Sequence, residues 1–300
     1  MLQSRKGPAF WLLTAFFALF VLFLYGPTIT IVILSFQGPS GGLTFPMQGV
    51  SLHWFGNLFE KQMVGDFAGS FQRSIVLGLV TMVVTVLVSF SAGLAFRKRF
   101  VGSSVIFYLA IASLIVPSIL ISLGIGLTFR LFDLSMHWLL EQFGFEAASA
   151  AYTSAMGLYT SALGAHLTWT LPFGLLIMFA VFNRFDRRYE EVARDLGATS
   201  WQTVKHVIVP IVLPSLIGVG LFGFTLSYDE FSRSLYTSGT FNTLPLEIYG
   251  MTTNVTTPVL YALGTVTTGL SFLVIALALV STIIVRRRRE RLGSDAGKAA

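Results

Sequence analysis

Residues 74–96 read SIVLGLVTMVVTVLVSFSAGLAF, a stretch without a single charged side chain. A helix needs roughly 20 apolar residues to cross the hydrocarbon core of a membrane, and this stretch is long enough. Five further uncharged stretches lie outward from it: residues 9–36, 100–129, a helix within 147–183, 207–228, and a helix within 248–285. The sequence therefore predicts an all-α membrane protein with six transmembrane helices.

Composition supports lipid as the solvent for most of the chain. Hydrophobic residues make up 54% of the 300 residues and charged residues only 11%, against about 25% charged in soluble domains. There is no cysteine, and the four histidines are scattered along the chain. Phosphate-loop, nucleophile-elbow and HExxH patterns are missing from the sequence. The sequence therefore predicts a protein that is not an enzyme and that binds no metal.

Lys and Arg residues predict the orientation in the membrane. The predicted spans place 16 of the 20 basic residues on one face, including Arg97, Lys98, Arg99 and the basic tail 286–300, and the other four are Lys61, Arg73, Arg130 and Arg233. Because basic loops stay inside, both termini are predicted to be cytoplasmic. The net charge of +6 follows from this membrane pattern and does not indicate nucleic-acid binding.

Three regions are expected along the chain. Residues 1–66 hold an N-terminal helix that is too long for a cleaved signal peptide and an outer loop. Residues 67–285 hold five helices with a cytoplasmic loop at 186–209, and residues 286–300 are a basic tail. Pro117 and Pro172 are expected to kink their helices without breaking them. The last helix is expected to begin at Pro258, with Thr257 as its N-cap.

The longest inner loop, residues 186–210, reads DRRYEEVARDLGATSWQTVKHVIVP. The pattern predicts two short helices, the first with Val192, Ala193 and Leu196 on one face. Gly197 is suited to a left-handed C-terminal position, and the spacing of Thr199 and Gln202 fits a capping box for the second helix. Periodicity alone leaves open an ordinary amphipathic connector lying along the lipid headgroups.

The residue types in this loop are more specific. The loop resembles the EAA loop of binding-protein-dependent ABC permeases, E-A-A-x3-G-x9-I-x-L-P. Glu191, Ala193, Gly197 and Pro210 match at the required spacing, while valines at 192, 207 and 209 replace alanine, isoleucine and leucine. The resemblance implies a type I (MetI-like) importer fold whose core is the last five helices. It also implies that the chain holds no cofactor, because a separate ATPase binds ATP and Mg.

In that family the loop docks in a groove on the ATPase. The residues to which the resemblance assigns this coupling role are Glu190, Glu191, Val192, Ala193, Asp195, Leu196, Gly197 and Ala198.

Residues 166–173, 224–231 and 244–251 resemble the second permease of spermidine/putrescine importers. Such systems pair two different permeases, bind two copies of a cytoplasmic ATPase, and receive substrate from a soluble or lipid-anchored binding protein. The resemblance therefore implies a polyamine substrate and an inner-membrane location. The alternatives are another solute of the same machinery (aminoethylphosphonate-like, ferric or amino-acid-related) or a secondary transporter. The latter class usually has internal repeats, and none relates the two halves of this chain.

Four residues are candidates for the substrate pathway. Asp229 and Glu230 follow an uncharged run, and at ~1.5 Å per residue Asp229 lies about 28 Å along the helix from Pro210, near the outer interface. An outer-surface cap or an ion pair with Arg233 is the alternative role for this acidic pair. Trp169 and Tyr228 could offer aromatic faces to an ammonium group, with buried packing as their alternative role. His166 is expected to be a hydrogen-bonded residue of the helix bundle.

Overall fold

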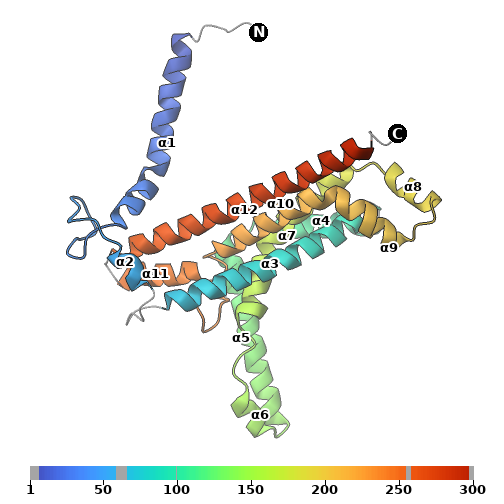
Figure 1. Ribbon diagram of the computed structural model, residues 1–300. Helices are drawn as coiled ribbons and strands as arrows, with labels where there is room; N and C mark the ends of the chain where they lie inside the picture. Colours follow the sequence, from blue (N-terminus) through green and yellow to red (C-terminus); the bar gives the residue numbers. More distant parts are fainter. Residues whose placement is uncertain (1–6, 59–65, 99, 255–257, 297–300) are drawn as a thin grey trace. The chain divides into compact units, whose positions relative to one another are not determined.

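The computed structural model describes residues 7–58, 66–98, 100–254 and 258–296, and it is entirely helical apart from connections and one isolated bridge (Figure 1). Six segments in these ranges are long and apolar enough to cross a membrane: Pro8–Leu34, Phe67–Phe96, Ser118–Gln142, Leu158–Asn183, Ser200–Tyr228 and Val259–Leu277. The predicted all-α fold with six spans is therefore confirmed. Thr257, the predicted N-cap of the last span, lies outside the described residues.

The elements follow in the order α1 (Pro8–Leu34), α2 (His53–Asn57), α3 (Phe67–Phe96), α4 (Ser103–Ala112), α5 (Ser118–Gln142), α6 (Glu146–Ala151), η1 (Leu158–Ala162), α7 (Leu163–Asn183), α8 (Arg188–Asp195), α9 (Ser200–Thr203), η2 (Val204–Ile208), α10 (Val209–Tyr228), α11 (Leu244–Asn254) and α12 (Val259–Ala296). The turns η1 and η2 are π-helical and run directly into α7 and α10. The chain forms two compact units, residues 1–68 with 248–270 and residues 69–247 with 271–300.

The prediction for Pro117 was wrong. The predicted span at 100–129 is two helices, because α4 ends at Ala112 and α5 begins at Ser118, with Pro117 as its N-cap. Proline lacks an N–H and disfavours helical geometry in the residue before it, so the chain leaves the helix here. α5 extends to Gln142 and therefore includes Arg130, which the predicted spans left outside the membrane helices. Pro172, in contrast, lies inside the continuous α7, as predicted.

In the second unit, α3 packs against α7 and α10 through small and hydroxyl side chains. The hydroxyl oxygens of Thr85 and Thr170 lie 2.8 Å apart. A Cβ on Gly174 of α7 would overlap Ser89 of α3, so the glycine permits this close approach. In membranes, close packing of small residues and hydrogen bonds between helices replace the hydrophobic effect as the force that joins helices.

An apolar cluster joins α7 to η2 and α10 in the same unit. Its buried members are Met178, Phe182, Ile208, Val212, Leu216 and Val219. Residues 184–203 connect α7 to η2 and contain the short helices α8 and α9; this segment is called the α8–α9 loop. The cluster therefore fixes the helices at both ends of the loop.

Candidate functional site

The α8–α9 loop has the two caps that its sequence predicts. Gly197 has φ +83°, and the two hydrogen bonds of a Schellman motif end α8: Gly197 N–H to Arg194 O at 2.8 Å and Ala198 N–H to Ala193 O at 3.0 Å. A capping box starts α9, because Thr199 N–H donates to Gln202 Oε1 at 2.8 Å and Gln202 N–H donates to Thr199 Oγ1 at 3.3 Å. Both caps are confirmed.

The apolar residues of α8 are not buried together. Ala193 is buried, whereas the exposed fractions of Val192 and Leu196 are 57% and 83%. Trp201 on α9 is exposed as well. Glu191 and Asp195 are also exposed, so the predicted coupling residues form mostly a free surface with acidic and apolar side chains. Glu190 differs from them, because its side chain is mostly covered and forms an ion pair with Arg97, the residue that follows α3.

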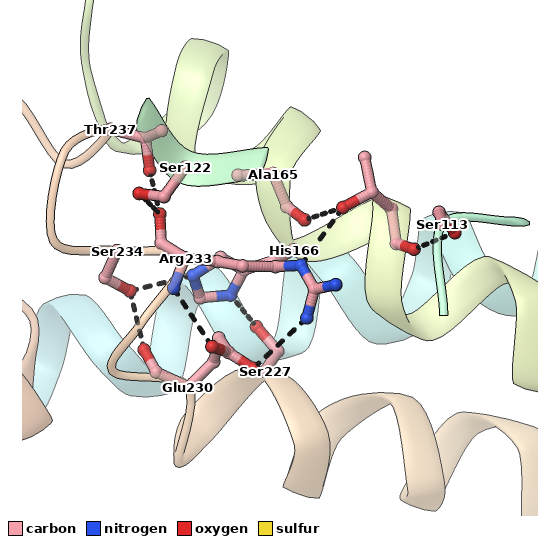
Figure 2. Close-up of polar contacts among 10 residues, drawn as sticks. Ser113, Ser122, Ala165, His166, Ser227, Glu230, Arg233, Ser234 and Thr237 are labelled. Atoms are coloured by element: carbon pink, nitrogen blue, oxygen red, sulfur yellow. Dashed lines mark hydrogen bonds and ion pairs between the residues drawn. The ribbon is translucent and has the colours of Figure 1, made fainter. Parts of the chain in front are cut away.

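A second site lies around Arg233, in the connection between α10 and α11 (Figure 2). The side chain of Arg233 is fully buried. Its Nε donates to Thr168 Oγ1 at 3.1 Å, its Nη1 lies 3.6 Å from Glu230 Oε2, and its Cζ lies 4.6 Å from the centre of the Trp169 ring. Burial lowers the pKa of the Arg233 guanidinium, and the Glu230 carboxylate opposes this shift.

Polar side chains from three helices and from the connection itself complete this arrangement. His166 Nδ1 lies 2.7 Å from Ser227 Oγ, and His166 Nε2 lies 2.9 Å from Ser234 Oγ. Ser227 Oγ in turn donates to Thr81 Oγ1 of α3 at 3.2 Å. His166 is therefore a hydrogen-bonded residue of the bundle, as the sequence predicts.

The backbone of Arg233 is fixed as firmly as its side chain. Its carbonyl oxygen accepts from Ser122 Oγ of α5 at 2.9 Å and from Thr237 Oγ1 at 2.5 Å. Arg233 N–H donates to Glu230 Oε1 at 3.0 Å. These bonds attach the connection after α10 to α5 and α7, as the dashed lines in Figure 2 show.

The structure separates the four residues predicted for the substrate pathway. Glu230 and Trp169 meet around Arg233, which occupies the aromatic face of Trp169. Asp229 is exposed at the end of α10. Tyr228 is buried and its ring stacks on Phe224, with 5.8 Å between ring centres. The ion pair that was the alternative for the acidic pair therefore exists for Glu230.

Sequence reasoning did not find the polar residues around Arg233, namely Thr168, Ser227 and Ser234. Serine and threonine are common in membrane helices, so their presence in the sequence does not indicate a buried polar site. The one available sign was Arg233 itself, a cation three residues after Glu230 and close to a long apolar run.

The six spans and the capped loop define a class, the membrane-spanning permease subunits of ABC importers. Residues 85–292 match the family described as "Binding-protein-dependent transport system inner membrane component", and the chain belongs to this family. Such a permease is not catalytic, and a separate subunit of the transporter hydrolyses ATP.

Two proteins are similar to this chain in sequence, and a solved structure is similar to it in fold. The spermidine/putrescine transport system permease protein PotC of Haemophilus influenzae is 27% identical over 93% of this chain and 98% of its own length. The putrescine transport system permease protein PotI of Escherichia coli K12 is 26% identical over 82% of each chain. A solved bacterial alginate ABC transporter, in complex with its periplasmic protein, is similar in fold at 14% identity, with a TM-score of 0.62 and 96% of each chain covered.

Proposed function

We propose that this chain forms half of the translocation pore of an importer for a di- or polyamine. The observation that carries the proposal is its similarity to PotC over nearly the full length of both chains. In this proposal a second, homologous permease completes the pore as a heterodimer. Two ATPase copies bind below, and a soluble or lipid-anchored binding protein delivers the substrate. The alternative is another small solute carried by the same machinery, whether aminoethylphosphonate-like, ferric or amino-acid-related.

We further propose that the α8–α9 loop faces the cytoplasm together with both termini. The distribution of Lys and Arg along the chain supports this orientation. The loop is then the docking element for the ATPase. Exposed apolar side chains in this loop, such as Leu196 and Trp201, support a docking role, because a contact would remove their apolar area from water.

At the opposite end of α10, the residues suit a cationic solute. Asp229 is an exposed acid at the helix end, and Glu230 and Trp169 already stabilise a positive charge, that of Arg233. Because Arg233 already occupies Glu230 and the face of Trp169, Asp229 is the acid of this group that is left for an ammonium group of the solute. In the proposed pathway the Asp229 carboxylate offsets part of the hydration free energy that the ammonium groups of a polyamine lose on entry.

Reconstitution tests the proposed function directly. The chain, its second permease, the ATPase and the binding protein are placed in liposomes with labelled putrescine or spermidine. Uptake should require ATP inside the liposomes and the binding protein outside, and the chain by itself should transport nothing. Uptake by the lone chain without ATP would identify a secondary transporter. Uptake of a phosphonate or ferric solute but not of a polyamine would contradict the proposed substrate.

Replacing Asp229 by asparagine should reduce polyamine uptake without changing assembly of the complex. Because Asp229 is exposed, the lost interaction should be worth about 1 kcal/mol or less, which is about fivefold or less in rate. The measurement is the initial uptake rate at saturating binding protein. Glu141→Gln is the matched control, since it removes another exposed acid. Equal rates for Asp229→Asn and Glu141→Gln would remove Asp229 from the pathway.

A further inference from the structure

Arg97, the residue that follows α3, is held in one position by several contacts. The guanidinium carbon of Arg97 lies 5.3 Å from the ring centre of Phe182 and 5.1 Å from that of Phe185. The backbone carbonyl of Arg97 accepts a hydrogen bond from Arg187 Nη2 at 3.0 Å. Only 12% of the Arg97 side chain is exposed. The aromatic contacts alone therefore hold the Arg97 side chain in place, independently of an acidic partner.

The acid that it meets is Glu190, in the first turn of α8. The two side chains form an ion pair, and the exposed fraction of Glu190 is 15%. Glu190 also lies 4.0 Å from Arg194 on the same helix, but 61% of the Arg194 side chain is exposed, so this contact is the weaker of the two. Glu190 thus points toward the bundle, while its neighbour Glu191 is exposed.

The Arg97–Glu190 pair connects α8 to a second transmembrane span. α8 also contacts α9 and η2, which lead into α10. The Arg97–Glu190 pair adds a contact to a different span, α3, which is packed tightly along α7 and α10. A displacement of α8 would therefore reach α3 through a side-chain contact as well as reaching α10 through the chain.

We propose that Arg97 and Glu190 are a transmission pair that transfers the motion of the α8–α9 loop to α3 during each ATP cycle. Both are positioning residues, because neither needs to touch the solute or the nucleotide. The inference rests on the proposed coupling role of the loop. In this inference the exposed residues of the loop contact the ATPase, whereas Glu190 contacts the permease itself.

The first test uses Arg97→Gln and Glu190→Gln in the complete reconstituted importer. The measured quantity is the number of solute molecules taken up per ATP hydrolysed, which does not change if only the amount of folded complex falls. Each variant should lower this ratio about fivefold, the size expected for coupling between groups in contact. Lys98→Gln is the matched control, since it removes an adjacent, exposed positive charge, and it should leave the ratio unchanged.

A second test exploits the absence of cysteine from the chain. Arg97→Cys combined with Glu190→Cys should be as poorly coupled as the glutamine variants. A short bis-maleimide that joins the two sulfurs should restore most of the ratio, whereas a monofunctional maleimide should not. Cysteines of the partner subunits are first replaced. A purely electrostatic role for the pair would give no recovery on cross-linking, and that result would overturn the proposal.

The tests also separate this inference from the proposed function. If both glutamine variants keep the normal ratio while Gly197→Asp uncouples transport, the transmission pair is wrong and the loop's coupling role stands. If Gly197→Asp also transports normally, the coupling role of the loop fails as well.

Discussion

Gly197→Asp should abolish coupled uptake while the chain still inserts into the membrane. The backbone at Gly197 is left-handed, with φ +83°, and a side chain there costs roughly 1–2 kcal/mol. Space is open around the Cβ position, so the free chain pays only this conformational cost. In contact with the ATPase, a buried and unpaired carboxylate would cost several kcal/mol more. The measurements are solute uptake and co-purification of the ATPase.

Gly102 offers a matched control for this experiment. Its φ is +85°, and nothing lies within 4 Å of its Cβ position. Gly102→Asp therefore imposes a similar backbone cost in the loop before α4 and should retain uptake. Equal losses in the two variants would show that the defect is one of folding. Normal transport by Gly197→Asp would remove the α8–α9 loop from the mechanism.

Glu230→Gln should strongly destabilise the protein. Arg233 is fully buried, and Glu230 is the carboxylate 3.6 Å from its Nη1. Removing one partner of a buried ion pair leaves an uncompensated charge, which costs about 3–5 kcal/mol. The measurement is the free energy of unfolding in detergent. The variant keeps the size of the side chain, so the loss reports charge rather than packing.

Two further variants decide the interpretation of that result. Asp229→Asn changes the adjacent, exposed acid and should leave stability nearly unchanged. Combining Glu230→Gln with Arg233→Met removes both charges and should be more stable than Glu230→Gln alone, because no unpaired charge remains. If Glu230→Gln is as stable as the unaltered protein, the ion pair does not hold the connection after α10.

Local rules explain what could be predicted from the sequence. Every span except α5 follows from a long apolar run, and the caps around Gly197 and Thr199 follow from residues within a few positions of each other. Pro117 was not predictable in the same way. A proline kinks a membrane helix when neighbouring groups satisfy the freed carbonyls and ends it when they do not. That outcome depends on residues distant in sequence.

The acidic residues show the same limit more sharply. Asp229 and Glu230 are adjacent and chemically similar, yet one is exposed and the other pairs with a buried arginine. Glu190 and Glu191 divide in the same manner, since only Glu190 meets Arg97. Which of two neighbouring acids turns inward depends on where the partner cation lies in space. The position of the partner cation in space cannot be predicted from the periodicity of the sequence.

The cap that ends α8 at Gly197 and the cap that starts α9 at Thr199 affect how strongly the loop can bind a partner subunit. The turn between α8 and α9 is determined by hydrogen bonds within the loop, so its shape does not depend on a partner. A flexible segment must be ordered on binding, at about 0.5–1.5 kcal/mol for each immobilised side chain plus the backbone cost. A loop that is already shaped avoids most of the backbone part. Its affinity can then stay high while its contact area stays small.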